Sequence, residues 1–213
     1  LEMAANFFLQ ASRSTGVPTK VAGAMYARGV MLSETLRSED AIAVYDEVAR
    51  RFGAAPEVAL RELVAKALVN KGGGLRQLGR YEDAIVVWDE VISRFGAAPE
   101  LSLREQVGKA LMSKGLTLGQ LGWSEAELAV YDEVVARFGT APEAAWREQV
   151  ARALLFKGIT LGQLGRSEVA IVVYDEMVAR FGSSLEAALR ELVAKALVNK
   201  GGALEQLGRD EDA

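Results

Sequence analysis

Residues 39–42 are Glu39-Asp40-Ala41-Ile42, and the same four residues return at 82–85. Related versions of this segment begin at Glu125, Glu168 and Glu211, so that its start recurs at a constant spacing of 43 residues. A fixed period of this size is typical of a stacked array, in which each unit buries its apolar face only against its neighbours. The period therefore predicts a helical repeat protein before any single motif is considered.

Composition excludes several classes of function. Half of the 213 residues are hydrophobic and a quarter are charged, so the chain can bury a substantial core. It contains no cysteine and no histidine, which removes disulfides, thiol nucleophiles, zinc sites of the Cys/His type and imidazole chemistry. The net charge of −4 argues against nucleic-acid or anionic-membrane partners. With no long apolar run and no secretory signal in the first nine residues, we expect a cytoplasmic protein.

Residues 56–96 illustrate one unit as a long helix followed by a shorter one. Pro56 suits the first turn of a helix, and Gly79 suits the position just past its end. The first helix has an apolar stripe at helical spacing, made by Leu60, Leu63, Val64, Ala67, Leu68, Leu75 and Leu78. The second opens on acidic residues and has a buried face made by Ala84, Ile85, Trp88, Val91, Ile92 and Phe95, before Gly96 closes it.

The glycines at 72–74 lie inside the first helix, where each costs roughly 1 kcal/mol relative to alanine. They do not form a phosphate-binding loop, because Lys71 precedes them and no strand does. Close approach of two helices is the better interpretation, since only the first of the three glycines recurs throughout the array, as Gly29, Gly72, Gly115, Gly158 and Gly201.

The spacing of small and aromatic residues resembles that of the tetratricopeptide repeat family. The matching residues of one unit are Leu68, Gly72, Leu75, Ala84, Trp88 and Val91, and the same frame fits the next two units. The period exceeds the family's, which is about 34 residues, and the excess falls at the start of the first helix. The closing proline of the family is absent, and lysine precedes the central glycine.

The resemblance implies an all-α solenoid of stacked antiparallel helix pairs that forms a right-handed superhelix. We expect full units at residues 18–52, 56–95, 99–138 and 142–181, and a partial fifth unit at 185–213. Residues 1–15 resemble the remnant of a preceding second helix. Both ends therefore have the pattern of interior seams, and we expect the array to be part of a longer protein.

The family binds extended or helical protein segments in a concave groove lined by its first helices. Carried over by position, that groove comprises Tyr26, Lys66, Asn70, Gln77, Lys109, Met112, Ser113, Gln120, Arg152, Phe156, Gln163, Lys195, Asn199 and Gln206. Its columns of cations and amides resemble the grooves of relatives that clamp the carboxylates of a peptide. The Lys66/Asn70 and Lys195/Asn199 pairs are each one helical turn apart, so each pair has the spacing to address one acidic group.

Two alternatives stay open for these groove residues. A glutamate stands four residues before each cation, at Glu62, Glu105, Glu148 and Glu191, and such pairs also serve simply to support a helix. Phe156 breaks the Asn/Ser column with an aromatic ring, which suits either a binding hot spot or a local gap in the packing.

Adjacent carboxylates recur in four units, as Asp46-Glu47, Asp89-Glu90, Asp132-Glu133 and Asp175-Glu176. Neighbours on a helix diverge by about 100° and cannot converge on one substrate atom, so we do not expect a catalytic pair. We expect the aspartates and glutamates of this acidic column to accept ion pairs across the seam from Lys71, Lys114, Lys157 and Lys200, because a half-buried lysine needs a partner.

Two tryptophans depart from the repeat. Trp123 stands at a turn where other units have arginine, and an exposed ring there would suit contact with a partner or with another copy. Trp146 replaces a leucine of the first helix.

The sequence favours a scaffold that is not an enzyme, needs no cofactor or metal, and binds a protein or peptide segment. The alternative is a structural arm of a larger protein, or an engineered, consensus-like array, that self-associates through its ends and has no dedicated peptide ligand.

Overall fold

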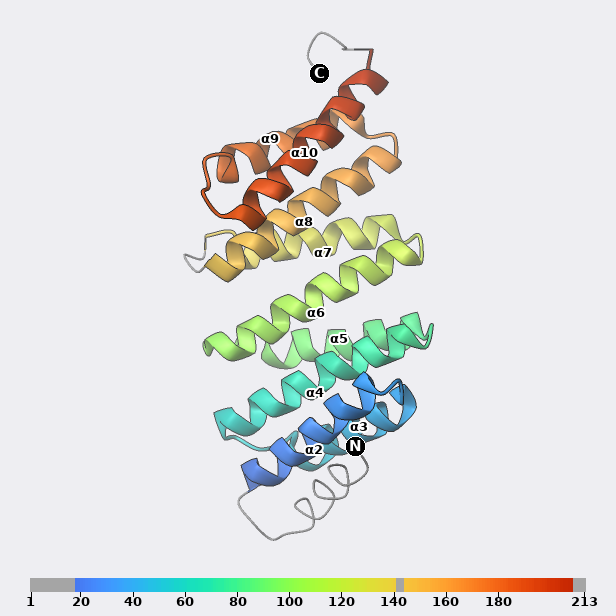
Figure 1. Cartoon of the computed structure of the whole chain (residues 1–213), viewed down its shortest axis with the longest axis vertical. Helices are drawn as coiled ribbons and strands as arrows, with labels where there is room; N and C mark the ends of the chain where they lie inside the picture. Colours follow the sequence, from blue (N-terminus) through green and yellow to red (C-terminus); the bar gives the residue numbers. More distant parts are fainter. Residues whose placement is uncertain (1–17, 141–143, 209–213) are drawn as a thin grey trace. The chain divides into compact units, whose positions relative to one another are not determined.

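The computed structural model describes residues 18–140 and 144–208. The expected helical remnant at 1–15 and the last residues of the partial fifth unit lie outside this part of the chain. Every element of the described residues is a helix (Figure 1). In chain order the helices are α2 (Pro18–Glu34), α3 (Ser38–Phe52), α4 (Val58–Gln77), α5 (Tyr81–Phe95), α6 (Leu101–Gln120), α7 (Ser124–Phe138), α8 (Ala144–Gln163), α9 (Ser167–Phe181) and α10 (Ala187–Gln206).

The chain divides into two compact units, Leu1–Thr117 and Leu118–Ala213, with the division inside α6. In the first unit, α2 packs on α3 and α4, and α4 packs on α3 and α5. In the second unit, α8 packs on α7 and α9, and α10 packs on α8 and α9. Each unit is thus a stack of helix pairs joined by short turns, and the predicted all-α solenoid is confirmed (Figure 1).

The helical periodicity places most of the predicted core correctly. In α4 the side chains of Leu60, Val64 and Leu68 are at most 3% exposed, whereas Leu63 is half-buried; Leu78, the C-cap residue of this helix, is 40% exposed. In α5 the predicted face is buried except at Ile92, which is half-buried, and Val87 joins the core. The helix α4 begins at Val58, after the N-cap residue Glu57, so Pro56 precedes the helix and does not lie in its first turn.

Each turn from a first to a second helix is closed in the same way. At Gly79 the backbone has φ +75°, the N–H of Arg80 donates to the carbonyl of Leu75 at 2.9 Å, and the N–H of Gly79 donates to that of Arg76 at 3.0 Å. This hydrogen-bond pattern ends a helix with one residue in the left-handed conformation, which glycine adopts at least cost. The first turn departs from the rule, because Leu36 occupies that conformation with φ 60° and is 88% exposed.

The recurring glycine of α2, α4 and α8 receives an aromatic ring from the following helix. A Cβ atom added at Gly72 would lie 2.3 Å from Nε1 of Trp88, and one at Gly158 would lie 2.3 Å from Tyr174. Gly29 faces Tyr45 in the same way, at 2.4 Å. The prediction of close helix approach is confirmed at these positions. At Gly201 no atom of the described residues lies within 4 Å of such a Cβ atom.

Candidate functional site

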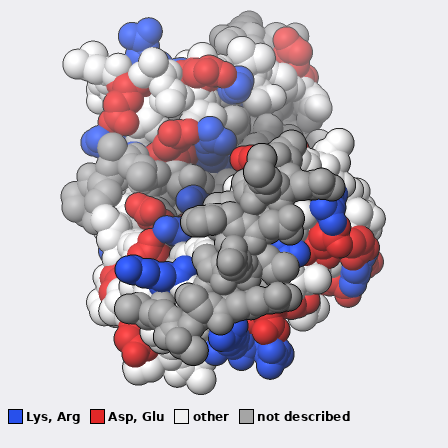
Figure 2. Space-filling view, turned by 60° about the horizontal axis from the view of Figure 1, so that its bottom comes forward, with Lys and Arg blue, Asp and Glu red and all other residues white. Residues whose placement is uncertain are grey.

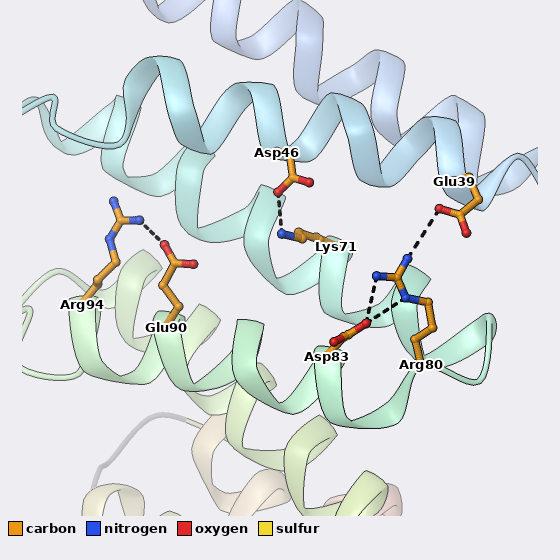
Figure 3. A network of polar contacts seen from close by, with 7 residues as sticks. All are labelled: Glu39, Asp46, Lys71, Arg80, Asp83, Glu90 and Arg94. Carbon is orange, nitrogen blue, oxygen red and sulfur yellow. Dashed lines mark hydrogen bonds and ion pairs between the residues drawn. The ribbon is translucent and has the colours of Figure 1, made fainter.

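Lysine–aspartate pairs join successive helices along the seam between neighbouring repeats. Nζ of Lys71 on α4 lies 2.5 Å from an oxygen of Asp46 on α3 (Figure 3). The equivalent lysines bind the equivalent aspartates in the later repeats, as Lys114–Asp89, Lys157–Asp132 and Lys200–Asp175. The lysine side chains are between 19% and 26% exposed. The predicted contact of the lysine column with the acidic column is therefore confirmed for the aspartates, whereas the adjacent glutamates bind arginines of their own helices.

Arginines add further ion pairs on the same surface. Figure 3 shows Arg80 between Glu39 and Asp83, with N–O distances of 3.7 Å and 2.9 Å. In the second unit Arg166 bonds Glu125 at 2.9 Å. In the described part of the face seen in Figure 2, basic and acidic side chains lie next to one another.

In the first unit the predicted groove residues contact one another and their own scaffold. Asn70 donates to the hydroxyls of Tyr26 and Tyr45 at 3.2 Å and 3.4 Å. Burial raises the pKa of Tyr45. Lys66 is bound to Glu62 at 2.6 Å, the helix-supporting arrangement that the sequence left open. The Lys66/Asn70 pair is therefore already partnered within the chain.

The remaining predicted residues of the first unit are unlike one another. Met112 is a core residue, only 7% exposed, so its assignment to an open groove is wrong. A flexible thioether suits such a packed position. Ser113 is half-buried, and Lys109 is exposed. Gln77 is exposed and accepts a weak hydrogen bond from the hydroxyl of Ser38 at 3.5 Å.

The glutamine column has a structural contact that sequence reasoning missed. In the second unit Oε1 of Gln206 accepts a hydrogen bond from the buried hydroxyl of Ser167 at 2.8 Å. This serine opens α9 just as Ser38 opens α3, and serine and glutamine lie 39 residues apart in both cases. The constant separation of the serine and the glutamine could have predicted this contact from the sequence. Gln120 and Gln163 are exposed.

The second unit contains a cavity of about 330 Å³ between the first helices α8 and α10. It brings together four of the predicted groove residues, Arg152, Phe156, Lys195 and Asn199. Its apolar lining is Leu155, Ile159, Ala188 and Leu192. A second cavity of about 350 Å³ shares Ile159 and Asn199 with the first and is lined by Gln163, Gln206, Tyr174 and Val198, among others. The two cavities follow one another along the same pair of helices.

Charges in the first cavity are neutralised locally. Arg152 is bound to Glu148 at 2.7 Å, and Lys195 is bound to Glu191 at 2.6 Å. The hydrogen bond from Lys195 holds the pKa of Glu191 below its usual value, and Arg152 contributes in the same direction. The side-chain amide of Asn199 donates to the carbonyl of Lys195 at 2.9 Å. The residues that resembled a carboxylate clamp are thus bound to their own helices.

Phe156 lies at the junction of cavity and core. It is half-buried, lines the first cavity, and stacks on the buried ring of Tyr131, with ring centroids 6.0 Å apart and planes inclined by 24°. The ring thus packs on the core, as the packing interpretation predicts, and the hot-spot interpretation stays a prediction for a residue that lines the cavity.

A buried carboxylic acid lies behind this pair of rings. The hydroxyl of Tyr131 donates to Glu127 at 3.0 Å, and Glu127 is only 7% exposed. Burial raises the pKa values of both groups. Glu127 stands where other repeats have Ala41, Ala84 or Ala170. Its carboxylate fits because Gly119 has no side chain: a Cβ atom there would lie only 2.8 Å from it. The departure from alanine was the signal that could have identified it.

The two unusual tryptophans differ in role. Trp123 is 48% exposed and forms the N-cap of α7, so the expected exposure is confirmed. Trp146 is 2% exposed and stacks on Phe138, with ring centroids 4.2 Å apart and planes inclined by 5°. It is a core residue of the second unit.

No described helix combines the length and apolar character needed to cross a membrane. No model of a protein family matches the chain, and no curated protein does either. Among solved structures, a tetratricopeptide repeat protein from Parabacteroides merdae is similar with a TM-score of 0.58 and 15% identity, over 90% of this chain and 75% of that one. MamA from Desulfovibrio magneticus is similar with a TM-score of 0.54 and 21% identity, over 93% and 96% of the two chains. The chain therefore has the fold of tetratricopeptide-like helical repeats.

Proposed function

We propose that this tetratricopeptide-like chain is a non-catalytic, cytoplasmic scaffold that binds a peptide or protein segment along its first helices. Helical repeats of this kind offer extended surfaces for such segments. The observation that carries the proposal is the pair of adjoining cavities between α8 and α10, each of which has the volume of a small binding pocket. Apolar side chains and amides line them together, which suits the side chains and the backbone of a peptide.

A binding experiment with matched variants tests this proposal. A random peptide library displayed on phage is selected against the whole chain, and the enriched peptides are synthesised and measured by fluorescence polarisation. Val198→Arg introduces a bulky charge at a 77% exposed residue that lines the second cavity. Val172→Arg makes the same change at a 65% exposed residue of α9 that lines neither cavity.

We expect the enriched peptides to bind wild type and Val172→Arg equally and Val198→Arg at least tenfold more weakly. Equal binding by both variants would place the peptide elsewhere on the molecule. Failure of the library to enrich any peptide on the wild-type chain would refute peptide binding altogether.

Self-association is a second candidate, favoured by one face of α10. Leu197 is 50% exposed, whereas the equivalent Leu68, Leu111 and Leu154 of the earlier first helices are at most 1% exposed. An apolar face that is covered in every other repeat suits contact with a second copy. Light scattering over a range of concentrations tests this: a mass that rises for wild type and stays constant for Leu197→Glu supports association through α10, and a constant wild-type mass refutes it.

A further inference from the structure

We propose that the cavity between α8 and α10 selects a large uncharged apolar side chain of the bound segment, which lies against the Phe156 ring. This inference rests on the proposed function and adds the chemistry of the anchoring residue. It differs from the binding of a peptide carboxylate, which the columns of cations and amides in the sequence suggested.

The first argument is the identity of the residue at this place in the repeat. Phe156 is equivalent to Ala27, Asn70, Ser113 and Asn199, so it is an aromatic ring at a position that is polar in three other repeats. Leu155, Ile159 and Leu192 line the same cavity. A volume of about 330 Å³ lies at the lower end of the range for small-molecule pockets, about 300–1,000 Å³, and suits one or two side chains.

The second argument is the charge of the cavity. Arg152 and Lys195 would attract an acidic ligand, but Glu148 and Glu191 are bound to them. The cavity thus contains two cations and two carboxylates, and a ligand carboxylate would meet as much repulsion as attraction. Electrostatic complementarity mainly determines specificity, so this balance disfavours charged anchors of either sign.

The third argument is the support behind the ring. Phe156 stacks on Tyr131, which is fully buried and whose hydroxyl is hydrogen-bonded to the buried Glu127. An anchoring surface that is already held in place loses little conformational freedom when it binds. Aromatic residues in such settings are frequent hot spots, whose truncation weakens binding by about 30-fold or more.

Parallel selections of one phage-displayed random peptide library test the proposal. They use the whole wild-type chain, Phe156→Asn and the double variant Glu148→Gln/Glu191→Gln. Phe156→Asn restores the residue that the repeat has at positions 70 and 199, and the double variant frees two cations on exposed or half-buried side chains. Thermal melts by circular dichroism establish that all three chains are folded.

We expect wild type to enrich Phe, Trp, Leu or Met at one shared peptide position, with Asp and Glu depleted there. We expect Phe156→Asn to lose this preference and the double variant to gain acidic residues at the same or a neighbouring position. For a synthesised wild-type binder, replacing the anchor by alanine should weaken binding by about 30-fold in fluorescence polarisation.

Two outcomes overturn the inference while peptide binding stands: enrichment of acidic anchors by wild type, or the same apolar consensus from Phe156→Asn. If Phe156→Asn does not fold, the double variant decides, because an unchanged consensus there contradicts the role given to Glu148 and Glu191. No enrichment on wild type overturns the proposed function and this inference together.

Discussion

The contact between Gly72 and Trp88 makes the substitution Gly72→Ala a sharp test of how the helices are held. The new methyl group would lie 2.3 Å from Nε1 and 2.6 Å from Cε2 of a ring that is 1% exposed. Carbon atoms in normal contact are about 3.5–4.0 Å apart, so the ring or the helix must move by more than about 1 Å. Such movement would also disturb the bond from the indole N–H to the carbonyl of Val69, 3.3 Å long.

The magnitude follows from three contributions. Overpacking of a core costs about 1–3 kcal/mol, a lost hydrogen bond costs about 1 kcal/mol, and the better helix propensity of alanine returns about 1 kcal/mol. We expect Gly72→Ala to lower the free energy of unfolding by about 1–3 kcal/mol. Gly73 is the matched control, because nothing lies within 4 Å of a Cβ added there, and Gly73→Ala should raise it by up to about 1 kcal/mol.

Urea denaturation followed by circular dichroism measures both variants under one set of conditions. Opposite shifts of the two midpoints are the expected result. If Gly72→Ala is as stable as Gly73→Ala, the ring does not need the glycine, and the explanation of its recurrence is wrong. Gly201→Ala should behave like Gly73→Ala, because its position is also open.

Three further predictions concern a turn, a buried acid and the lysine column. Leu36→Gly should raise the free energy of unfolding by about 1 kcal/mol, since it removes a side chain from a left-handed backbone with φ 60°, and an unchanged urea midpoint would contradict this. Burial raises the pKa of Glu127 in the folded chain, so its protonated form favours folding. Wild-type stability should therefore fall, relative to Glu127→Gln, as pH rises from about 4.3, the usual value for the unfolded chain, and level off above the raised pKa. Thermal melts of both chains between pH 4 and pH 8 measure this difference, and a constant gap would refute it. Lys71→Met should change the free energy of unfolding by less than about 1 kcal/mol, because its partner Asp46 is 54% exposed, and a larger loss in urea denaturation would show that the seam depends on this ion pair.

Features that recur with the period could be predicted from the sequence. Gly72, Trp88 and Lys71 each have counterparts one period away, and repetition alone marks them as parts of the scaffold. The pairing of lysine with aspartate across the seam followed from the need of a half-buried ammonium group for a partner. The helices and their main apolar faces could be predicted from apolar residues that recur at helical spacing.

Features that depend on one local departure could not be predicted in the same way. Glu127 is buried because Gly119, on the preceding helix, leaves room for its carboxylate, and neither residue alone indicates the other. The spacing of Glu191 and Lys195 in the sequence allowed an ion pair between them, but only the structure shows that this ion pair forms. Met112 shares its position in the repeat with Val69, Leu155 and Val198, which range from 4% exposed at Leu155 to 77% at Val198, so position in the repeat alone did not fix its burial.

Two departures from the repeat are linked at the proposed binding site: Phe156 lines the cavity and stacks on Tyr131, which is hydrogen-bonded to Glu127. A uniform array offers the same surface in every unit and cannot by itself favour one register of a bound segment. Phe156 gives the second compact unit an aromatic ring at this position of the repeat. The ring stacks on Tyr131, and the hydrogen bond from Tyr131 to the buried Glu127 makes the core behind it differ from that of the other repeats. Because Phe156 and the buried Glu127 both depart from the repeat and are linked through Tyr131, a packing accident confined to Phe156 explains less than the proposed site for one side chain.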